Sequence, residues 1–226
     1  MKPYEVVFSS LKLTDEDIFR ELGYGKTTPE SYVVEEVAGL MEYLACHIKP
    51  GCAFAIYDGE ATRDSIYLND IQLNTGKVIA PLMKHSTAFA VFAATAGQEF
   101  EAYTHQLKQE GDILRSFLLD TIGTCIAERA GDYMENRLKE QIGGLNHTNR
   151  FSPGYCGWHL TEQKKIFHLL GDTPCGIQLS EVCLMTPIKS ISGIIGVGER
   201  VARKQYGCNI CDFEDCYKRR LKNELL

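Results

Sequence analysis

Residues 150–155, with the sequence RFSPGY, are the densest group of residues suited to binding a small molecule. Arg150 offers a planar fork of N–H donors that matches a carboxylate. Pro153 fixes a backbone angle, and Gly154 lets a ligand or another chain segment approach the backbone closely. Tyr155 adds an aromatic ring with a hydroxyl at its edge. These residue types predict a cradle for a zwitterionic, partly aromatic molecule, and the alternative is an ordinary surface turn with a salt-bridged arginine.

A second candidate site is the cysteine cluster Cys208, Cys211 and Cys216 near the end of the chain. Two thiolates separated by two residues can hold one metal ion or cluster from a tight turn, and the third lies within reach. Three ligands are one short of a closed tetrahedral site. Candidates for the fourth are Cys156, Cys183 and His159. An iron–sulfur cluster or a structural zinc ion suits these donors, and three reduced thiols without a metal are the alternative.

Composition limits the class of protein that must position these residues. The chain has 226 residues, and its 24 basic and 30 acidic side chains give a formal charge of −6. This length predicts a single domain over residues 1–226, with residues 199–226 forming a Cys-rich basic tail that belongs to it. The acidic balance argues against nucleic-acid binding, and no apolar run reaches the roughly 18 residues of a membrane span. Nine cysteines, an odd number, without a recognisable signal peptide favour reduced thiols and a cytoplasmic location.

The hydrophobic pattern predicts both helices and strands. Helices are expected over residues 14–22, 28–50, 112–142 and 161–170, from 98 onward and again from about 214, with Thr14, Thr28 and Thr161 as N-caps. Strands are expected over residues 52–57, 65–68, 88–94, 177–185 and 190–197. Because the strands gather in two stretches instead of alternating with helices, an α+β fold is favoured, with a mainly antiparallel sheet flanked by helices.

Three ordered blocks carry a resemblance to a known family. They are AERAGDY at residues 127–133, RFSPGY at 150–155, and a third block that contains LSE at 179–181, Met185, Pro187 and SISG at 190–193. Together they resemble the S-adenosylmethionine-binding activation domain of cobalamin-dependent methionine synthase. The run GYCGW at 154–158 resembles the shorter, free-standing members of that family. The resemblance covers residues 117–195 well and is weak elsewhere.

The resemblance implies a C-shaped domain that binds S-adenosylmethionine and presents its methyl group to an inactive corrinoid. By position, Arg150 would hold the methionine carboxylate and Glu128 the ammonium group, while Gly154 and Tyr155 would pack at the ligand beside Pro153. On residue type alone, Glu128 would be an exposed acid on a solvated helix face.

Part of the family pattern has no clear counterpart in this sequence. An acidic ligand contact expected near the N-terminus cannot be aligned, and Asp15 and Asp17 are candidates by location only. A tyrosine expected after the third block has no match. Gly193, Gly196 and Gly198 have the wrong order for a dinucleotide fingerprint and are read as part of a strand.

The expected function is accessory to a methyltransferase reaction. The chain is too short to hold a cobalamin domain as well, so cobalamin would arrive on a partner and an external donor would supply an electron. The first hypothesis is an activation module acting in trans on a core methionine synthase. The alternatives are a reactivator of another corrinoid methyltransferase, with the cysteine cluster as electron relay, and a non-enzymatic docking module that binds S-adenosylmethionine.

Overall fold

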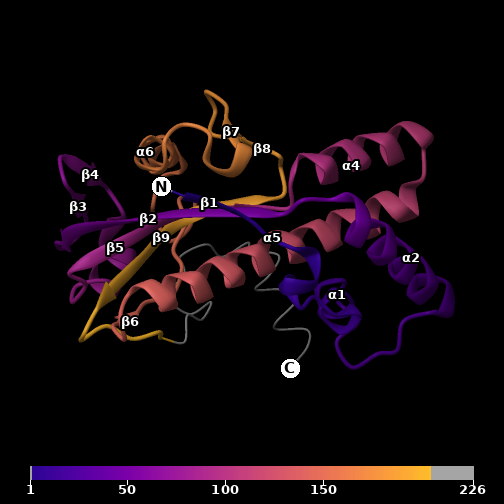
Figure 1. The fold of residues 1–226 in the computed structure, drawn as a ribbon, viewed down its shortest axis with the longest axis horizontal. Coiled ribbons are helices and arrows are strands. Elements are labelled where there is room, and N and C mark those ends of the chain that lie inside the picture. The colour runs from indigo at the N-terminus through magenta and orange to yellow at the C-terminus, as the bar shows by residue number, and fades with distance from the viewer. Residues whose placement is uncertain (1, 205–226) are drawn as a thin grey trace.

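The computed structural model describes residues 2–204, and six α-helices and nine β-strands lie in this range (Figure 1). The helices are α1 Asp15–Glu21, α2 Ser31–His47, α3 Gly76–Leu82, α4 Gln98–Glu110, α5 Ile113–Gln141 and α6 Gln163–Leu170. Short 3-10 turns are η1 Phe8–Leu11, η2 Leu160–Glu162 and η3 Pro174–Gly176. The strands are β1 Lys2–Glu5, β2 Gly51–Ala61, β3 Ile66–Leu68, β4 Ile71–Leu73, β5 Ala88–Thr95, β6 Asn146–His147, β7 Gln178–Leu179, β8 Met185–Thr186 and β9 Ser190–Gly198.

Seven strands form one sheet in which every pairing is antiparallel. Their order is β4-β3-β2-β5-β9-β6, and β1 pairs with the first part of β2. Strands β7 and β8 form a separate hairpin. The predicted α+β class with a mainly antiparallel sheet is therefore confirmed.

Helices cover both faces of this sheet. In Figure 1, α6 and the β7–β8 hairpin lie on one face and the long helix α5 crosses the other. The central strand β5 is buried at every position except its first. Burial on both faces explains why residues 88–94 read as a continuous apolar run instead of an alternating one.

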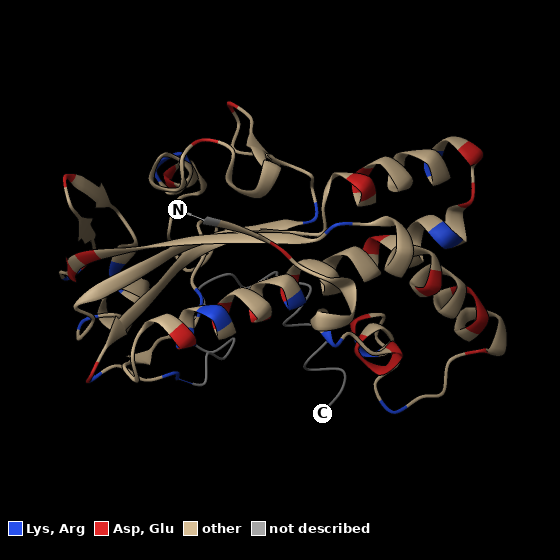
Figure 2. Ribbon diagram, in the orientation of Figure 1, with Lys and Arg blue, Asp and Glu red and all other residues tan. Residues whose placement is uncertain are grey.

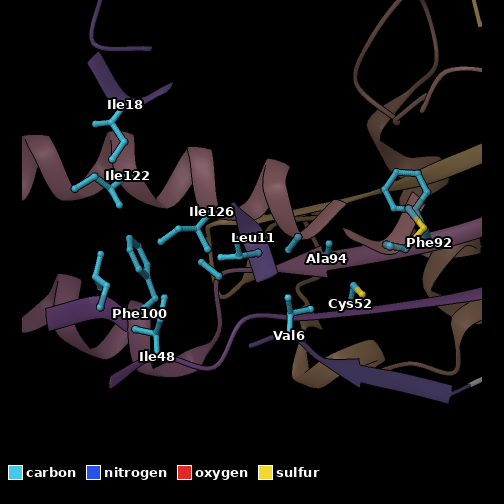
Figure 3. Packing of buried hydrophobic residues seen from close by; sticks show 14 of the residues in the cluster. Val6, Leu11, Ile18, Ile48, Cys52, Phe92, Ala94, Phe100, Ile122 and Ile126 are labelled. Atoms are coloured by element: carbon cyan, nitrogen blue, oxygen red, sulfur yellow. The ribbon is translucent and has the colours of Figure 1, made fainter. Parts of the chain in front are cut away.

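The larger hydrophobic core lies on the α5 side of the sheet. Figure 3 shows part of it, in which Ile122 and Ile126 of α5 lie near Phe100 of α4 and Leu11 of η1. A second cluster on the opposite face contains Trp158, which is 1% exposed, together with residues of α3 and α6. The two cores hold α5 and the motif loop at fixed positions relative to the sheet.

Two predicted helix starts are wrong by a few residues. Helix α2 begins at Ser31 with Glu30 at its N-cap, so Thr28 and Pro29 precede the helix. Thr161 lies within a 3-10 turn, and α6 begins at Gln163. In contrast, Thr14 caps α1 as predicted, because its side chain and that of Asp17 satisfy each other's backbone N–H groups in a capping box.

The continuous strand predicted over residues 177–185 is wrong, and this difference is larger than the shifts of the helix starts. Only two residues at each end are extended, and a turn lies between them. The Ser180 hydroxyl accepts a hydrogen bond from the Leu184 N–H, and Cys183 has a left-handed φ of 63°. This local side-chain bond closes a turn that hydrophobic alternation does not reveal. The short elements β1, α3, β4 and β6 were not predicted, and the helix predicted from residue 214 lies outside the described residues.

Candidate functional site

One face of α5 carries three acidic side chains and a glycine. Glu128, Gly131, Asp132 and Glu135 are spaced by three or four residues, so they lie above one another on the same side of the helix. Glu128 and Asp132 are about half exposed, whereas the Glu135 side chain is only 4% exposed. This acidic face points toward the loop that carries Arg150.

Strand β9 anchors that loop to the main sheet. The Phe151 N–H donates to the Ile194 carbonyl over 3.0 Å, and the Ile194 N–H donates back over 2.9 Å. A Cβ atom at Gly193 would lie 2.1 Å from the Phe151 carbonyl oxygen, so only glycine admits this approach. Gly193, Gly196 and Gly198 thus belong to a strand, as predicted, and two backbone hydrogen bonds fix the start of the motif.

The Arg150 guanidinium lies among the carboxylates of α5. Its Nη2 is 3.0 Å from Glu128 Oε2 and 3.0 Å from Asp132 Oδ1, and its Nη1 donates to the Glu128 carbonyl over 3.3 Å. A Cβ on Gly131 would come within 2.2 Å of Nη1, so the missing side chain makes room for the guanidinium. The structure therefore brings the predicted pair Arg150 and Glu128 together, in direct contact with each other.

The remaining motif residues form a tight turn beside this pair. Gly154 has a φ of 94°, which favours glycine, and its N–H donates to the Trp158 carbonyl over 2.7 Å. Pro153 is buried, and the Tyr155 side chain is exposed. The turn thus holds an aromatic ring in solvent-accessible space next to Arg150.

A cleft of about 320 Å³ opens where these elements meet. Its lining residues are Ile79, Phe92, Glu128, Asn149, Arg150, Phe151, Ser152, Tyr155, Ile191 and Arg203. Pro153 and Gly154 support the wall without lining it. Of the predicted ligand contacts, Glu128, Arg150 and Tyr155 line the cleft, and its other lining residues, among them Asn149, Ser152, Ile191 and Arg203, were not predicted as contacts. Ser152 and Ile191 lie within recognised blocks and Asn149 adjoins one, whereas no local pattern marks Arg203.

The predicted N-terminal acidic contact falls beside the same helix. Asp17 of α1, whose first turn is acidic (Figure 2), lies 2.6 Å from Arg129 Nη2. Burial raises the pKa of Asp17, but hydrogen bonds from Arg129 and Thr14 outweigh it, so its pKa lies below the ordinary value. Asp17 also lines a second pocket of about 200 Å³ that Glu128 and Asp132 share. Asp15 is exposed, so of the two candidates Asp17 is the one that lies near Glu128.

The predicted metal site falls mainly outside the part of the chain that the structure describes. Cys208, Cys211 and Cys216 lie outside it, and within residues 2–204 no group of three or more His, Cys, Asp or Glu side chains has a metal-binding arrangement. Cys156 is buried in the motif turn, 8% exposed. The metal site stays a prediction.

We predict that protein purified without oxygen contains iron and sulfide, or else zinc, bound by the three tail cysteines. Removing one thiolate leaves too few ligands, so Cys211→Ala should lower the bound metal strongly, while Cys125→Ala, on α5, should not. Elemental analysis measures metal per chain, and a visible charge-transfer band separates iron from zinc. Equal metal contents in both variants and the wild type would contradict the prediction.

Comparison with solved structures identifies the fold. The chain matches a crystal structure of the MetH reactivation domain bound to AdoHcy with a TM-score of 0.69 and 15% sequence identity. The match covers 91% of this chain and 80% of that one. The architecture built around α5 and the antiparallel sheet is therefore that of a reactivation domain.

The sequence itself defines the family. Residues 69–220 match the family model of the vitamin B12 dependent methionine synthase activation domain. The chain belongs to this family. No curated protein matches it significantly, and no helix within residues 2–204 is long and apolar enough to cross a membrane.

Proposed function

We propose that this chain binds S-adenosylmethionine in the cleft beside Arg150 and supports reductive methylation of cob(II)alamin carried by a partner. The single observation that carries the proposal is the Arg150–Glu128 pair on the wall of a cleft of about 320 Å³. That volume lies within the range of pockets for small molecules. The family and the AdoHcy-bound relative of the same fold support this ligand class.

The charges on the cleft wall suit the amino-acid end of the ligand. A guanidinium pairs with a carboxylate through two parallel hydrogen bonds, and a carboxylate pairs with an ammonium group. In the structure, Arg150 donates a hydrogen bond to Glu128. The zwitterionic end of the ligand can replace this contact with two new ones, because its carboxylate can bind Arg150 and its ammonium group can bind Glu128. Tyr155 also lines the cleft, and its ring would cover the aromatic ring system of the ligand.

The proposed reaction uses the bound molecule as a methyl donor. One electron from an external donor and one methyl group from S-adenosylmethionine convert cob(II)alamin to methylcobalamin, and S-adenosylhomocysteine is released. This chain holds the sulfonium ligand at one end and leaves the methyl group accessible to the partner's corrinoid. The rate gain comes from positioning the two reactants next to each other.

We predict that the chain accelerates formation of methylcobalamin on a corrinoid protein in its cob(II) state. The test mixes the two proteins with S-adenosylmethionine and a low-potential reductant, and it follows the loss of the cob(II) absorbance and the growth of the methylcobalamin spectrum. Reactions without this chain, or without S-adenosylmethionine, serve as controls and should be much slower.

Core methionine synthase is the first partner to test, and another corrinoid methyltransferase is the second. Binding of S-adenosylmethionine without acceleration on either partner would overturn the catalytic proposal and favour a docking module. Absence of binding in the presence of both partners would overturn the ligand assignment itself.

A further inference from the structure

Glu135 is a buried carboxylate whose charge the proposed reaction does not use. It lies two helical turns beyond Glu128 on the cleft-facing side of α5, and its side chain is 4% exposed. Its Oε2 atom has no hydrogen-bond partner among the described residues. Burying an ionised carboxylate is unfavourable unless it is paired and hydrogen-bonded, so this oxygen needs an explanation.

Two arginines that line the cleft converge on this carboxylate. Arg203 Nη1 donates to Glu135 Oε1 over 2.7 Å, and Arg150 Nε lies 3.9 Å from Glu135 Oε2. Both guanidiniums are on the cleft wall. Lys139 Nζ and His147 Nε2 each lie 3.8 Å from Oε1. Of these four neighbouring side chains, Arg150 alone therefore approaches Oε2, the oxygen without a hydrogen bond.

The chain holds Arg203 in place through backbone contacts after β9. The Lys204 N–H donates to Asn149 Oδ1 over 2.9 Å, and Asn146 Nδ2 donates to the Glu199 carbonyl over 2.9 Å. Val201 between them is buried. The segment after β9 is thus attached to residues 146–149, which lead into the motif, and Glu135 joins this segment to α5.

We propose that Glu135 is a positioning residue of the ligand site, which holds the Nε edge of Arg150 and the guanidinium of Arg203 against the cleft wall. This inference rests on the proposed function. A ligand carboxylate that binds Nη2 of Arg150 would replace the contacts of this atom with Glu128 and Asp132. The guanidinium then needs another partner that fixes its position. A shift of about 1 Å brings Nε within hydrogen-bond distance of Glu135 Oε2. The unpartnered oxygen is then satisfied in the bound state.

The test measures S-adenosylmethionine binding to the full chain by calorimetry. Glu135→Gln keeps the shape and removes the charge, and it should weaken binding about tenfold, as loss of a charged hydrogen bond does. The matched control is Glu140→Gln, the same change at an exposed position of α5 that pairs with Arg137. It should bind like the wild type. Thermal unfolding of each variant verifies that it is folded at the binding temperature.

A double-mutant cycle separates positioning from a general structural role. Arg150→Lys keeps a positive charge but lacks the Nε edge that faces Glu135. In that background, Glu135→Gln should change the affinity by less than about twofold. Glu135→Asp keeps the carboxylate, so in the presence of Arg150 it should retain part of the affinity that Glu135→Gln loses. The positioning role alone would be overturned if Glu135→Gln lowered the affinity equally with Arg150 and with Lys at that position through Arg150→Lys. It would also be overturned if Glu135→Gln bound S-adenosylmethionine like the wild type. Absence of binding by the wild type would overturn the proposed function and this inference together.

Discussion

Replacing Arg150 with alanine should weaken S-adenosylmethionine binding by about 1.5–3 kcal/mol, because it removes a charge-assisted contact to the ligand carboxylate. The change also leaves Glu128 and Asp132 without the cation that lies 3.0 Å from each of them. Without that cation, the two side-chain carboxylates repel the ligand carboxylate, which adds to the loss of its arginine partner. Calorimetry of the two proteins at one ionic strength measures the difference.

A suitable control for this prediction is Arg137→Ala. Arg137 lies on α5 and pairs with Glu140 at the surface, so its removal changes the net charge equally without touching the cleft. It should leave the affinity unchanged. Equal affinities of Arg150→Ala and the wild type would contradict the assignment of Arg150 as the carboxylate partner.

A single methyl group at Gly131 should also impair the site. The new Cβ would lie 2.2 Å from Arg150 Nη1 and 2.7 Å from Ile191 Cδ1. Both atoms are ends of flexible side chains, so the chain should fold while the guanidinium moves away from its position. We expect Gly131→Ala to lower the affinity for S-adenosylmethionine about tenfold, since the charged contact is weakened. The free energy of unfolding should change by less than about 1 kcal/mol, because alanine favours the helix.

Gly123→Ala is the matched control on α5. Its Cβ would lie 2.4 Å from Phe100 Cζ, in the core and away from the cleft. Overpacking there should lower the free energy of unfolding by about 1–3 kcal/mol and leave the affinity of the folded protein unchanged. Chemical denaturation and calorimetry of both variants compare the two effects. Loss of affinity in Gly123→Ala but not in Gly131→Ala would contradict the role of Gly131.

The sequence predicted the elements with long, regular patterns. Helix α5 and the strands β5 and β9 agree with their predicted bounds within about one residue, because their hydrophobic runs are long and their ends are marked by turn residues. The strand predicted over residues 177–185 failed because a hydroxyl of Ser180 closes a turn there. Two-residue strands such as β6 have no pattern of their own and form only when β9 is beside them.

The candidate site was predictable where it is local in sequence. Arg150 and Tyr155 belong to one loop, and their residue types show what they can bind. The roles of Gly131 and Glu135 depend on how the loop crosses α5, and that of Arg203 on how the chain returns after β9. These are contacts between segments distant in sequence, which the pattern around any one residue does not contain.

The position of β9 has a consequence for how the binding cleft is assembled during synthesis. This strand pairs with β5 and β6 and bonds to Phe151, and all three of these partners precede it in the chain. A nascent chain that ends before Ser190 carries the complete motif but lacks the strand that fixes it. The cleft therefore forms only after the ribosome has released residues 190–203, and non-local pairing of this kind is slow to form. Until then, the edge of β5 that pairs with β9 is unpaired and the apolar residues of β5 are exposed. We therefore expect a newly made chain to bind chaperones and to aggregate most readily during this interval.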